Sequence, residues 1–139
     1  MTISNAEWEI MRVVWTKQET TSSEILDVLS QKTEWTASTV KTLLRRLVDK
    51  SYLVTERVGK AFIYRPLMTE EESINRQVDQ TFAKFCQQKH LSIFEHLLEE
   101  APMTAEDIAR LQALLSQKTT VSNVPCNCIK GQCTCKEHQ

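Results

Sequence analysis

The fold is decided by residues 36–50, which read TASTVKTLLRRLVDK. Five apolar residues in this stretch follow the spacing i, i+3, i+4, i+7, i+8, which places their side chains on one face of an α-helix. They are Val40, Leu43, Leu44, Leu47 and Val48. This is the most regular helical pattern in the chain, and we expect a helix that opens at Trp35 and Thr36 and buries the stripe.

Two shorter helices are predicted upstream of this one. Each opens with a Ser or Thr followed three residues later by Glu, which is the signature of a capping box: Ser4 with Glu7, and Thr21 with Glu24. Apolar residues at helical spacing follow each box, and they are Trp8, Met11, Val14 and Trp15, then Ile25, Val28 and Leu29.

A β-hairpin is predicted downstream. Residues 52–58 and 61–65 are rich in β-branched and aromatic residues, Gly59 and Lys60 between them supply a turn, and Pro66 ends the second strand. Three short helices followed by a hairpin is the order of elements in a winged helix-turn-helix, whose third helix enters the major groove of DNA.

The polar face of the third predicted helix has the groups that this role needs. Hydroxyls can bind phosphates or base edges, and cations can bind phosphates or guanine. The candidate DNA contacts are Ser38, Thr39, Lys41, Thr42, Arg45 and Arg46, with Lys50 on the flank, and Lys60 on the wing beside Arg57 and Arg65. A helix with cations on its exposed face can also be merely solvated, but the order of elements favours DNA binding.

The charge balance differs between the two halves of the chain. Residues 1–65 carry ten Lys and Arg and eight Asp and Glu, a net charge of +2, whereas residues 66–119 carry five against nine, a net charge of −4. A charge of +2 is modest for a DNA-binding domain, so we expect a dimer that doubles the phosphate contacts.

The second half supplies three further amphipathic helices. The first is capped by Thr69 with Glu72, the second stops at Pro102, and the third starts at Thr104. Their apolar stripes are Ile74, Val78, Phe82 and Phe85, then Leu91, Phe94, Leu97 and Leu98, then Ile108, Leu111, Leu114 and Leu115. Three such helices cannot easily bury these faces alone, which favours a homodimer that reads an inverted repeat. The alternative is a self-contained helical cap on the first domain.

The tail contains two C-x-C pairs four residues apart, Cys126, Cys128, Cys133 and Cys135. In extended backbone each C-x-C points both sulfurs to one side, and Gly131 in the spacer lets the chain fold back. Four thiolates suit tetrahedral Zn(II), while tight C-x-C pairs also suit Cu(I), so the pattern fits both metals. A switchable sensory site is favoured over a structural zinc knot because the cluster lies at the end of the chain.

The other candidate ligands are assigned simpler roles. Cys86, next to Phe82 and Phe85, is interpreted as a small buried hydrophobic residue. His138 could join the metal site but is interpreted as a solvated terminal residue, and His90 and His96 as ordinary helix residues.

The composition argues against several classes of protein. The two glycines do not form a dinucleotide fingerprint or a P-loop, and no catalytic motif is found, so we expect no enzyme. No apolar run reaches the roughly 18 residues of a membrane span, and acidic and basic residues interrupt the N-terminus, so we expect a cytoplasmic protein.

These patterns together predict an α+β protein that is mainly α. Residues 1–67 form a winged helix-turn-helix DNA-binding domain, residues 68–117 a helical dimerisation region, and residues 118–139 a linker and the metal-binding tail.

Several stretches resemble a known family. Residues 5–15 (NAEWEIMRVVW), residues 35–43 (WTASTVKTL) with Arg46, Leu47 and Lys50, and residues 62–66 (FIYRP) resemble the DNA-binding domain of the penicillinase-repressor family, the winged-helix repressors similar to BlaI and MecI. The cysteine tail narrows the likeness to copper-responsive repressors of the CopY type. One departure is Ser51, where relatives often place glycine after the recognition helix.

The resemblance implies a homodimer that binds a palindromic operator ahead of copper-export genes. It further implies that Zn(II) on the four tail cysteines supports the DNA-bound form and that Cu(I) displaces zinc and releases the DNA, with a copper chaperone as a candidate donor of Cu(I). Two alternatives stay open: a repressor of the same fold inactivated by proteolysis in an antibiotic response, and a metal carrier without a regulatory role.

Overall fold

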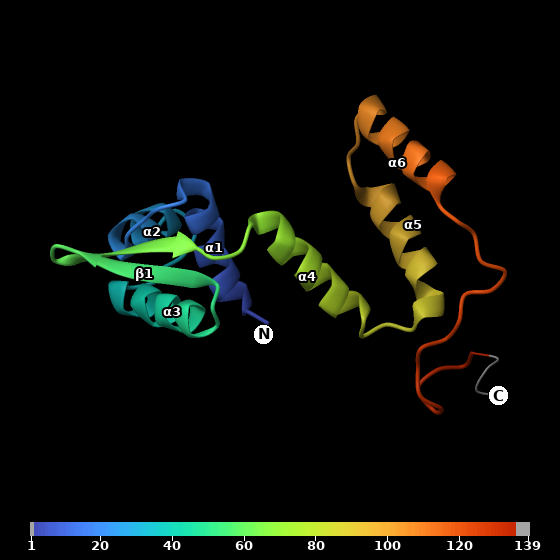
Figure 1. Ribbon diagram of the computed structural model, residues 1–139, viewed down its shortest axis with the longest axis horizontal. Coiled ribbons are helices and arrows are strands. Elements are labelled where there is room, and N and C mark those ends of the chain that lie inside the picture. The colour runs from blue at the N-terminus through green and yellow to red at the C-terminus, as the bar shows by residue number, and fades with distance from the viewer. Residues whose placement is uncertain (1, 136–139) are drawn as a thin grey trace. The chain divides into compact units, whose positions relative to one another are not determined.

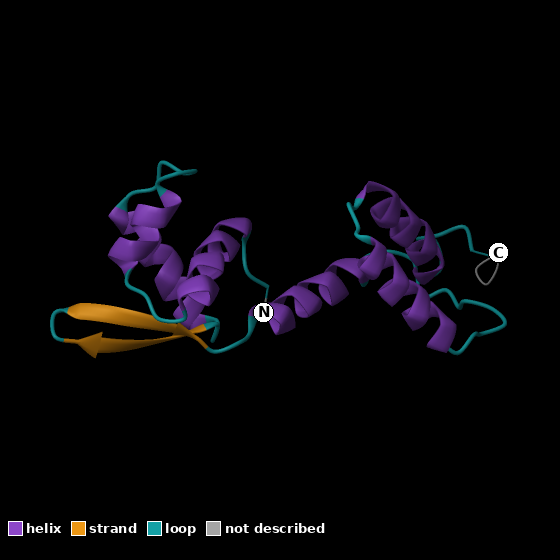
Figure 2. Cartoon of the chain, turned by 90° about the horizontal axis from the view of Figure 1, so that it is seen from above, coloured by secondary structure: helices purple, strands orange, loops and turns teal. Residues whose placement is uncertain are grey.

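The computed structural model describes residues 2–135. These residues form two compact units, which meet in sequence between Val78 and Asp79. The first unit contains three helices and a hairpin, in the predicted order, and then the first part of a fourth helix (Figures 1 and 2). Their bounds are α1 Asn5–Lys17, α2 Ser22–Leu29, α3 Ala37–Asp49, β1 Leu53–Val58 and β2 Ala61–Pro66. The next elements are α4 Glu70–Phe82, the 3-10 helix η1 Gln87–Lys89, α5 His90–Glu100 and α6 Ala105–Gln117. The predicted fold class, mainly α with an N-terminal winged helix-turn-helix, is confirmed.

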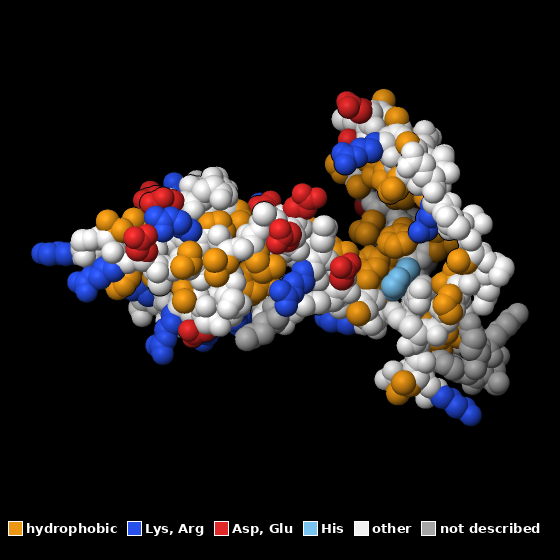
Figure 3. All heavy atoms as spheres, in the orientation of Figure 1, with side chains coloured by type: hydrophobic (Ala, Val, Ile, Leu, Met, Phe, Trp, Pro, Cys, Tyr) orange, Lys and Arg blue, Asp and Glu red, His pale blue; other side chains and the backbone are white. Residues whose placement is uncertain are grey.

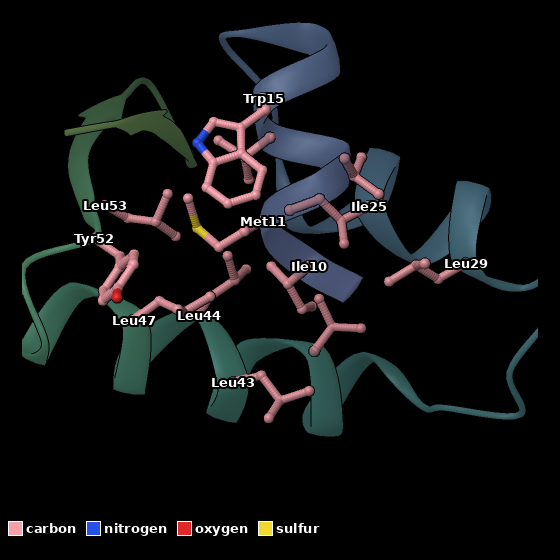
Figure 4. Packing of buried hydrophobic residues seen from close by; sticks show 13 residues of the cluster. Ile10, Met11, Trp15, Ile25, Leu29, Leu43, Leu44, Leu47, Tyr52 and Leu53 are labelled. Atoms are coloured by element: carbon pink, nitrogen blue, oxygen red, sulfur yellow. The ribbon is translucent and has the colours of Figure 1, made fainter. Parts of the chain in front are cut away.

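The core of the first unit is built on the α3 stripe. Val40, Leu44 and Leu47 are fully buried, and Leu43 is nearly so. Figure 4 shows Met11 of α1 at the centre of the cluster, with Leu44 of α3 on one side and Trp15 on the other. Burying a Leu or Met side chain stabilises the fold by about 1.5–3 kcal/mol, so this one stripe is worth several kcal/mol.

The hairpin is fixed to the helices by more than its own turn. The strands pair in antiparallel register from Leu53 with Pro66 to Val58 with Ala61, and Gly59 takes a left-handed φ of 64° in the turn. Thr20, just before α2, also exchanges two backbone hydrogen bonds with Tyr64, at 3.1 and 2.8 Å. The wing is therefore held against the segment between α1 and α2.

Helix α3 ends in a Schellman motif centred on Ser51. The amide of Ser51 donates to the carbonyl of Val48, and that of Tyr52 donates to the carbonyl of Leu47, both at 3.0 Å. Ser51 itself has a φ of 63°, in the left-handed region that favours glycine. The departure from glycine noted in the sequence therefore keeps the fold but places a Cβ where the backbone disfavours one.

None of the described helices is long and apolar enough to cross a membrane.

We expect Ser51→Gly to stabilise the protein. Relief of a left-handed non-glycine residue is worth about 1–2 kcal/mol, and the greater chain entropy of unfolded glycine removes about 0.5–1 kcal/mol of that gain. Chemical denaturation should show an increase of about 0.5–1 kcal/mol in the free energy of unfolding. The matched control is Ser30→Gly. Ser30 is a C-cap residue with a φ of −61°, where glycine relieves no strain, so this change should lower the free energy of unfolding. A Ser51→Gly protein no more stable than the wild type would contradict this account.

Candidate DNA-contact helix and thiolate cluster

The outward face of α3 presents the predicted DNA contacts. Thr36 caps the helix by accepting a hydrogen bond from the Thr39 amide at 3.2 Å, which sets where the helix begins. Burial of the apolar stripe then turns the opposite side of α3 to solvent. The side chains of Ser38, Lys41, Thr42 and Arg45 line one shallow depression there, and Arg46 is also exposed.

Two of the hydroxyls on α3 already have partners within the helix. The Thr39 side chain is half-buried, with its Oγ1 3.2 Å from Oγ1 of Thr36. Thr42 Oγ1 donates to the carbonyl of Ser38 at 3.0 Å. Both hydroxyl oxygens can still accept hydrogen bonds, but Lys41, Arg45 and Arg46 are the cations on this face. Contact of these residues with DNA stays a prediction.

Lys and Arg side chains lie on the hairpin (Figure 3). They differ in whether they already form hydrogen bonds or ion pairs within the protein. Lys60 is exposed in the turn. The guanidinium of Arg57 lies 6.0 Å from the centre of the Phe62 ring, and its Nε donates to the Gly59 carbonyl at 3.2 Å. Arg65 is paired with Glu56 at 2.8 Å and Glu19 at 3.5 Å, and the hydrogen bond that its guanidinium donates to Glu56 raises the pKa of Arg65. Arg65 is therefore an internal ion-pair partner rather than a cation free for phosphate.

Lys50 has a structural partner that the sequence pattern did not reveal. Its Nζ lies 2.9 Å from Oε1 of Glu7, whose side chain is only 2% exposed. Burial raises the pKa of Glu7, but the hydrogen bonds from Lys50 and Ser4 outweigh burial, so the pKa is lowered overall. Lys50, placed on the flank of the DNA face from the sequence, instead ties the end of α3 to the start of α1.

Four cysteines of the second unit converge on one small volume. The Sγ atoms of Cys86, Cys126, Cys128 and Cys133 all lie within 4.8 Å of one another, and none of the five cysteines forms a disulfide. The Sγ of Cys126 is 3.4 Å from that of Cys133. A tetrahedral zinc site with Zn–S bonds of about 2.3 Å requires sulfurs about 3.8 Å apart. The cluster therefore has the composition and spacing to hold a metal ion.

Cys86 is the member of the cluster that sequence reasoning missed. It lies between α4 and α5 and is 8% exposed, so the interpretation as a buried residue fits. Its neighbours, however, are the tail thiols: its Sγ is 3.4 Å from that of Cys135 and 3.7 Å from that of Cys126. Its local sequence, beside Phe82 and Phe85, contains no ligand spacing, because its partners are 40 and 49 residues away.

His90 and His96 both lie on α5, in keeping with their interpretation as helix residues. His90 Nε2 lies 3.0 Å from the Phe82 carbonyl, and its ring packs against Phe82 with the ring centres 5.2 Å apart. His96 is exposed on α5, and His138 lies outside the described residues.

The thiols of the cluster do not ionise equally. A hydrogen bond from the Gln88 backbone lowers the pKa of Cys86. The hydrogen bond shared with Cys86 raises the pKa of Cys128 to about 12 and also raises that of Cys135. For Cys126, the Cys128 amide favours the thiolate, but burial and the Cys133 thiol outweigh it and raise the pKa. Without a metal cation the cluster therefore keeps most of its protons near neutral pH.

Metal binding should release protons from this cluster. Because thiols bind Zn(II) as thiolates and the pKa values of Cys126, Cys128 and Cys135 are raised, Zn(II) added to the reduced metal-free protein at about pH 7 should release several protons per ion. The apparent affinity for zinc should consequently fall as the pH is lowered. A pH indicator in weak buffer measures the release, and a chain with all five cysteines changed to serine is the blank. Release of less than one proton per bound Zn(II) would contradict this charge assignment.

Comparisons with known proteins match nearly the whole chain. The family model described as penicillinase repressor matches residues 3–117. An uncharacterized 16.5 kDa protein of Latilactobacillus sakei is 34% identical over 99% of this chain and 95% of its own length. The penicillinase repressor of Bacillus licheniformis is 29% identical over 83% of this chain and 90% of its own. The solved structure of the CopR repressor is 50% identical over 49% of this chain and 99% of its own, with a TM-score of 0.43. The extent of the family match shows that this chain belongs to the penicillinase repressor family of DNA-binding transcriptional repressors.

Proposed function

We propose that this repressor responds to copper. It binds a palindromic operator of copper-export genes as a homodimer, Zn(II) on the four tail cysteines supports the DNA-bound form, and Cu(I) displaces zinc and releases the DNA. The observation that carries the proposal is the convergence of three tail thiols, those of Cys126, Cys128 and Cys133, within 4.8 Å of one another. The tail lies beyond residues 3–117, the part matched by the family model, so a function common to the family does not account for it.

The chemistry of the cluster favours soft metal ions. Every group in it is a sulfur, and sulfur ligands select Cu(I) and Zn(II) over the harder cations that prefer oxygen. Zn(II) takes four sulfurs in a tetrahedron, whereas Cu(I) takes two or three. Exchange of one metal for the other changes how many sulfurs are held and in what geometry, and this difference can bias the protein between two states.

Recognition of DNA is assigned to the outward face of α3 and to the wing. Lys41, Arg45 and Arg46 supply charge for phosphates and guanine, Ser38, Thr39 and Thr42 supply hydroxyls, and Lys60 extends the contact to the adjacent backbone. Because α3 is anchored by its whole buried stripe, these side chains are presented on a rigid element.

The second copy of the chain is assigned to the faces of α5 and α6. Leu91, Leu97 and Phe94 on α5 are each about half exposed or more, as are Leu114 and Leu115 on α6. Figure 3 shows hydrophobic side chains gathered between these two helices. They line a groove of about 1770 Å³ that continues to Val121 and Val124. Sites for small molecules measure roughly 300–1,000 Å³, so a groove of this size fits a protein element such as a helix of a second copy.

Replacement of Arg45 tests the DNA face. The probe is the inverted repeat that the wild-type chain selects from randomised palindromic duplexes. We expect Arg45→Ala to weaken binding by about 1–3 kcal/mol and to relax the preference for guanine at one position of each half-site. Fluorescence anisotropy at fixed salt measures the affinity and should also give two chains per duplex. Arg76→Ala on α4 removes the same charge and serves as the control. If both variants lost the same affinity for the duplex, Arg45 would contribute only nonspecific charge to DNA binding.

Replacement of the tail cysteines tests the copper response. The full-length chain, loaded with Zn(II), should bind the selected duplex, and Cu(I) supplied as its acetonitrile complex should release it. Serine at Cys126, Cys128, Cys133 and Cys135 should make operator binding insensitive to Cu(I), as followed by gel shift.

The outcomes separate the alternatives. Release of the serine variant by Cu(I) would mean that the tail is not the sensor. A wild-type complex that ignores copper but is lost by proteolysis after β-lactam treatment would select the antibiotic-response repressor named among the relatives. Absence of any selected duplex would favour a metal carrier.

A further inference from the structure

We propose that Cys86 is a fifth thiolate ligand of the metal site and that metal binding fastens the tail to the turn between α4 and α5. The inference rests on the proposed metal site and adds to it a ligand from the helical part of the chain. We call residues 83–89 the corner, because they connect the end of α4 to the start of α5.

The backbone of the corner is held by hydrogen bonds on both sides of Cys86. The Phe85 amide donates to the Phe82 carbonyl at 3.0 Å, and the Lys89 amide donates to the Cys86 carbonyl at 2.9 Å. The Phe82 ring stacks on Phe94 of α5 with the ring centres 5.6 Å apart. The backbone on both sides of Cys86 is thus fixed by helices, whereas the tail cysteines lie on a segment without helix or strand.

The tail is joined to the corner by contacts that involve no sulfur. The Gln87 amide donates to Oδ1 of Asn127 at 2.8 Å, and the Gln88 side chain donates to the Val124 carbonyl at 2.8 Å. Asn127 is the residue between the first two tail cysteines. These hydrogen bonds place the C-x-C pair against Cys86, so the approach of the sulfurs does not depend on the thiols alone.

Five sulfurs can bind either one Zn(II) ion or two Cu(I) ions. Four of them, Cys86 included, lie within 4.8 Å and can surround one Zn(II), and Cys135 is 3.4 Å from Cys86. Two Cu(I) ions with three sulfurs each need six Cu–S bonds, which five thiolates supply if one sulfur bridges both ions. Each thiol that binds gives its proton to the solvent, and no electron is transferred.

With Cys86 as a ligand, a change of metal can affect the helices as well as the tail. A site made of tail residues alone could change its metal without any effect on α4 or α5. A site that includes Cys86 pulls on the corner, and the corner leads directly into α5, which carries the apolar face proposed for the second copy. Exchange of Zn(II) for Cu(I) would then change the position of α5.

The ligand itself can be identified in the wild-type chain. Cadmium-113 replaces Zn(II) in thiolate sites, and its scalar coupling to the β protons of each bound cysteine is detected by NMR. We expect a correlation to Cys86 along with those to tail cysteines. Correlations confined to Cys126, Cys128, Cys133 and Cys135 would overturn the proposal, and this result is independent of whether any variant folds.

The coupling is tested with Cys86→Ser and, because the site is buried, with Cys86→Ala as a second variant. Ala83→Ser, which places the same hydroxyl on the exposed side of the corner, is the control. In the wild type and the control, Cu(I) should slow amide hydrogen exchange in both the tail and residues 83–89. In both Cys86 variants it should slow exchange in the tail alone, and the Cu(I) concentration needed to release the operator should rise by at least about tenfold, as for a weakened metal ligand.

The results also distinguish the two proposals. Equal protection of the corner, with unchanged release of operator DNA, in the wild type and the Cys86 variants would overturn the role of Cys86 while leaving copper sensing by the tail intact. A wild-type chain that binds cadmium through Cys86 but keeps its operator in Cu(I) would instead overturn the copper response and support the five-thiol site.

Discussion

Burial of one stripe of α3 is the constraint on which the DNA-binding unit depends. A helix has a single solvent face once its apolar face is fixed, and Val40, Leu44 and Leu47 are fully buried. A rotation of α3 by one residue would turn the helix through about 100°, which would expose leucines and drive charged side chains such as Arg45 into the core. Packing against α1 and the hairpin therefore decides which side chains are available to DNA, and the same contacts make their presentation rigid.

Much of the fold follows from local sequence, because the signals that define its elements are local. Ser4, Thr21, Thr36 and Thr104 cap helices where the sequence predicts, and Gly59 occupies the turn of the hairpin. The contacts that sequence reasoning missed are long-range. The Glu7 and Lys50 pair spans 43 residues, and the bridge between Thr20 and Tyr64 joins the wing to a loop that has no strand pattern of its own. No local periodicity encodes such pairs, so they emerge only when the helices pack.

The thiolate cluster also combines residues that local sequence reveals with one that only a long-range contact reveals. Four of its thiols are apparent from the C-x-C spacing, because those residues are close in sequence and must be close in space. The fifth depends on where the corner between α4 and α5 brings Cys86. Its burial was predictable from its aromatic neighbours, yet burial alone does not distinguish an apolar residue from a ligand that awaits its metal. The proposal that Cys86 is a ligand rests instead on a tertiary contact, the 3.4 Å separation of the Cys86 and Cys135 sulfurs.

Helix α4 is the helix that precedes Cys86 in the chain. The helix begins in the first compact unit and ends in the second. At its start, Ser73 is buried, and its hydroxyl donates to the Thr69 carbonyl at 2.9 Å, while Trp15 of α1 donates to the nearby Met68 carbonyl at 2.9 Å. At its end, four residues separate Phe82 from the start of η1, and Cys86 is the last of them. Under the proposal, a metal bound through Cys86 would hold the segment that directly follows α4, whereas a metal bound only within the tail would hold only the irregular segment that follows α6.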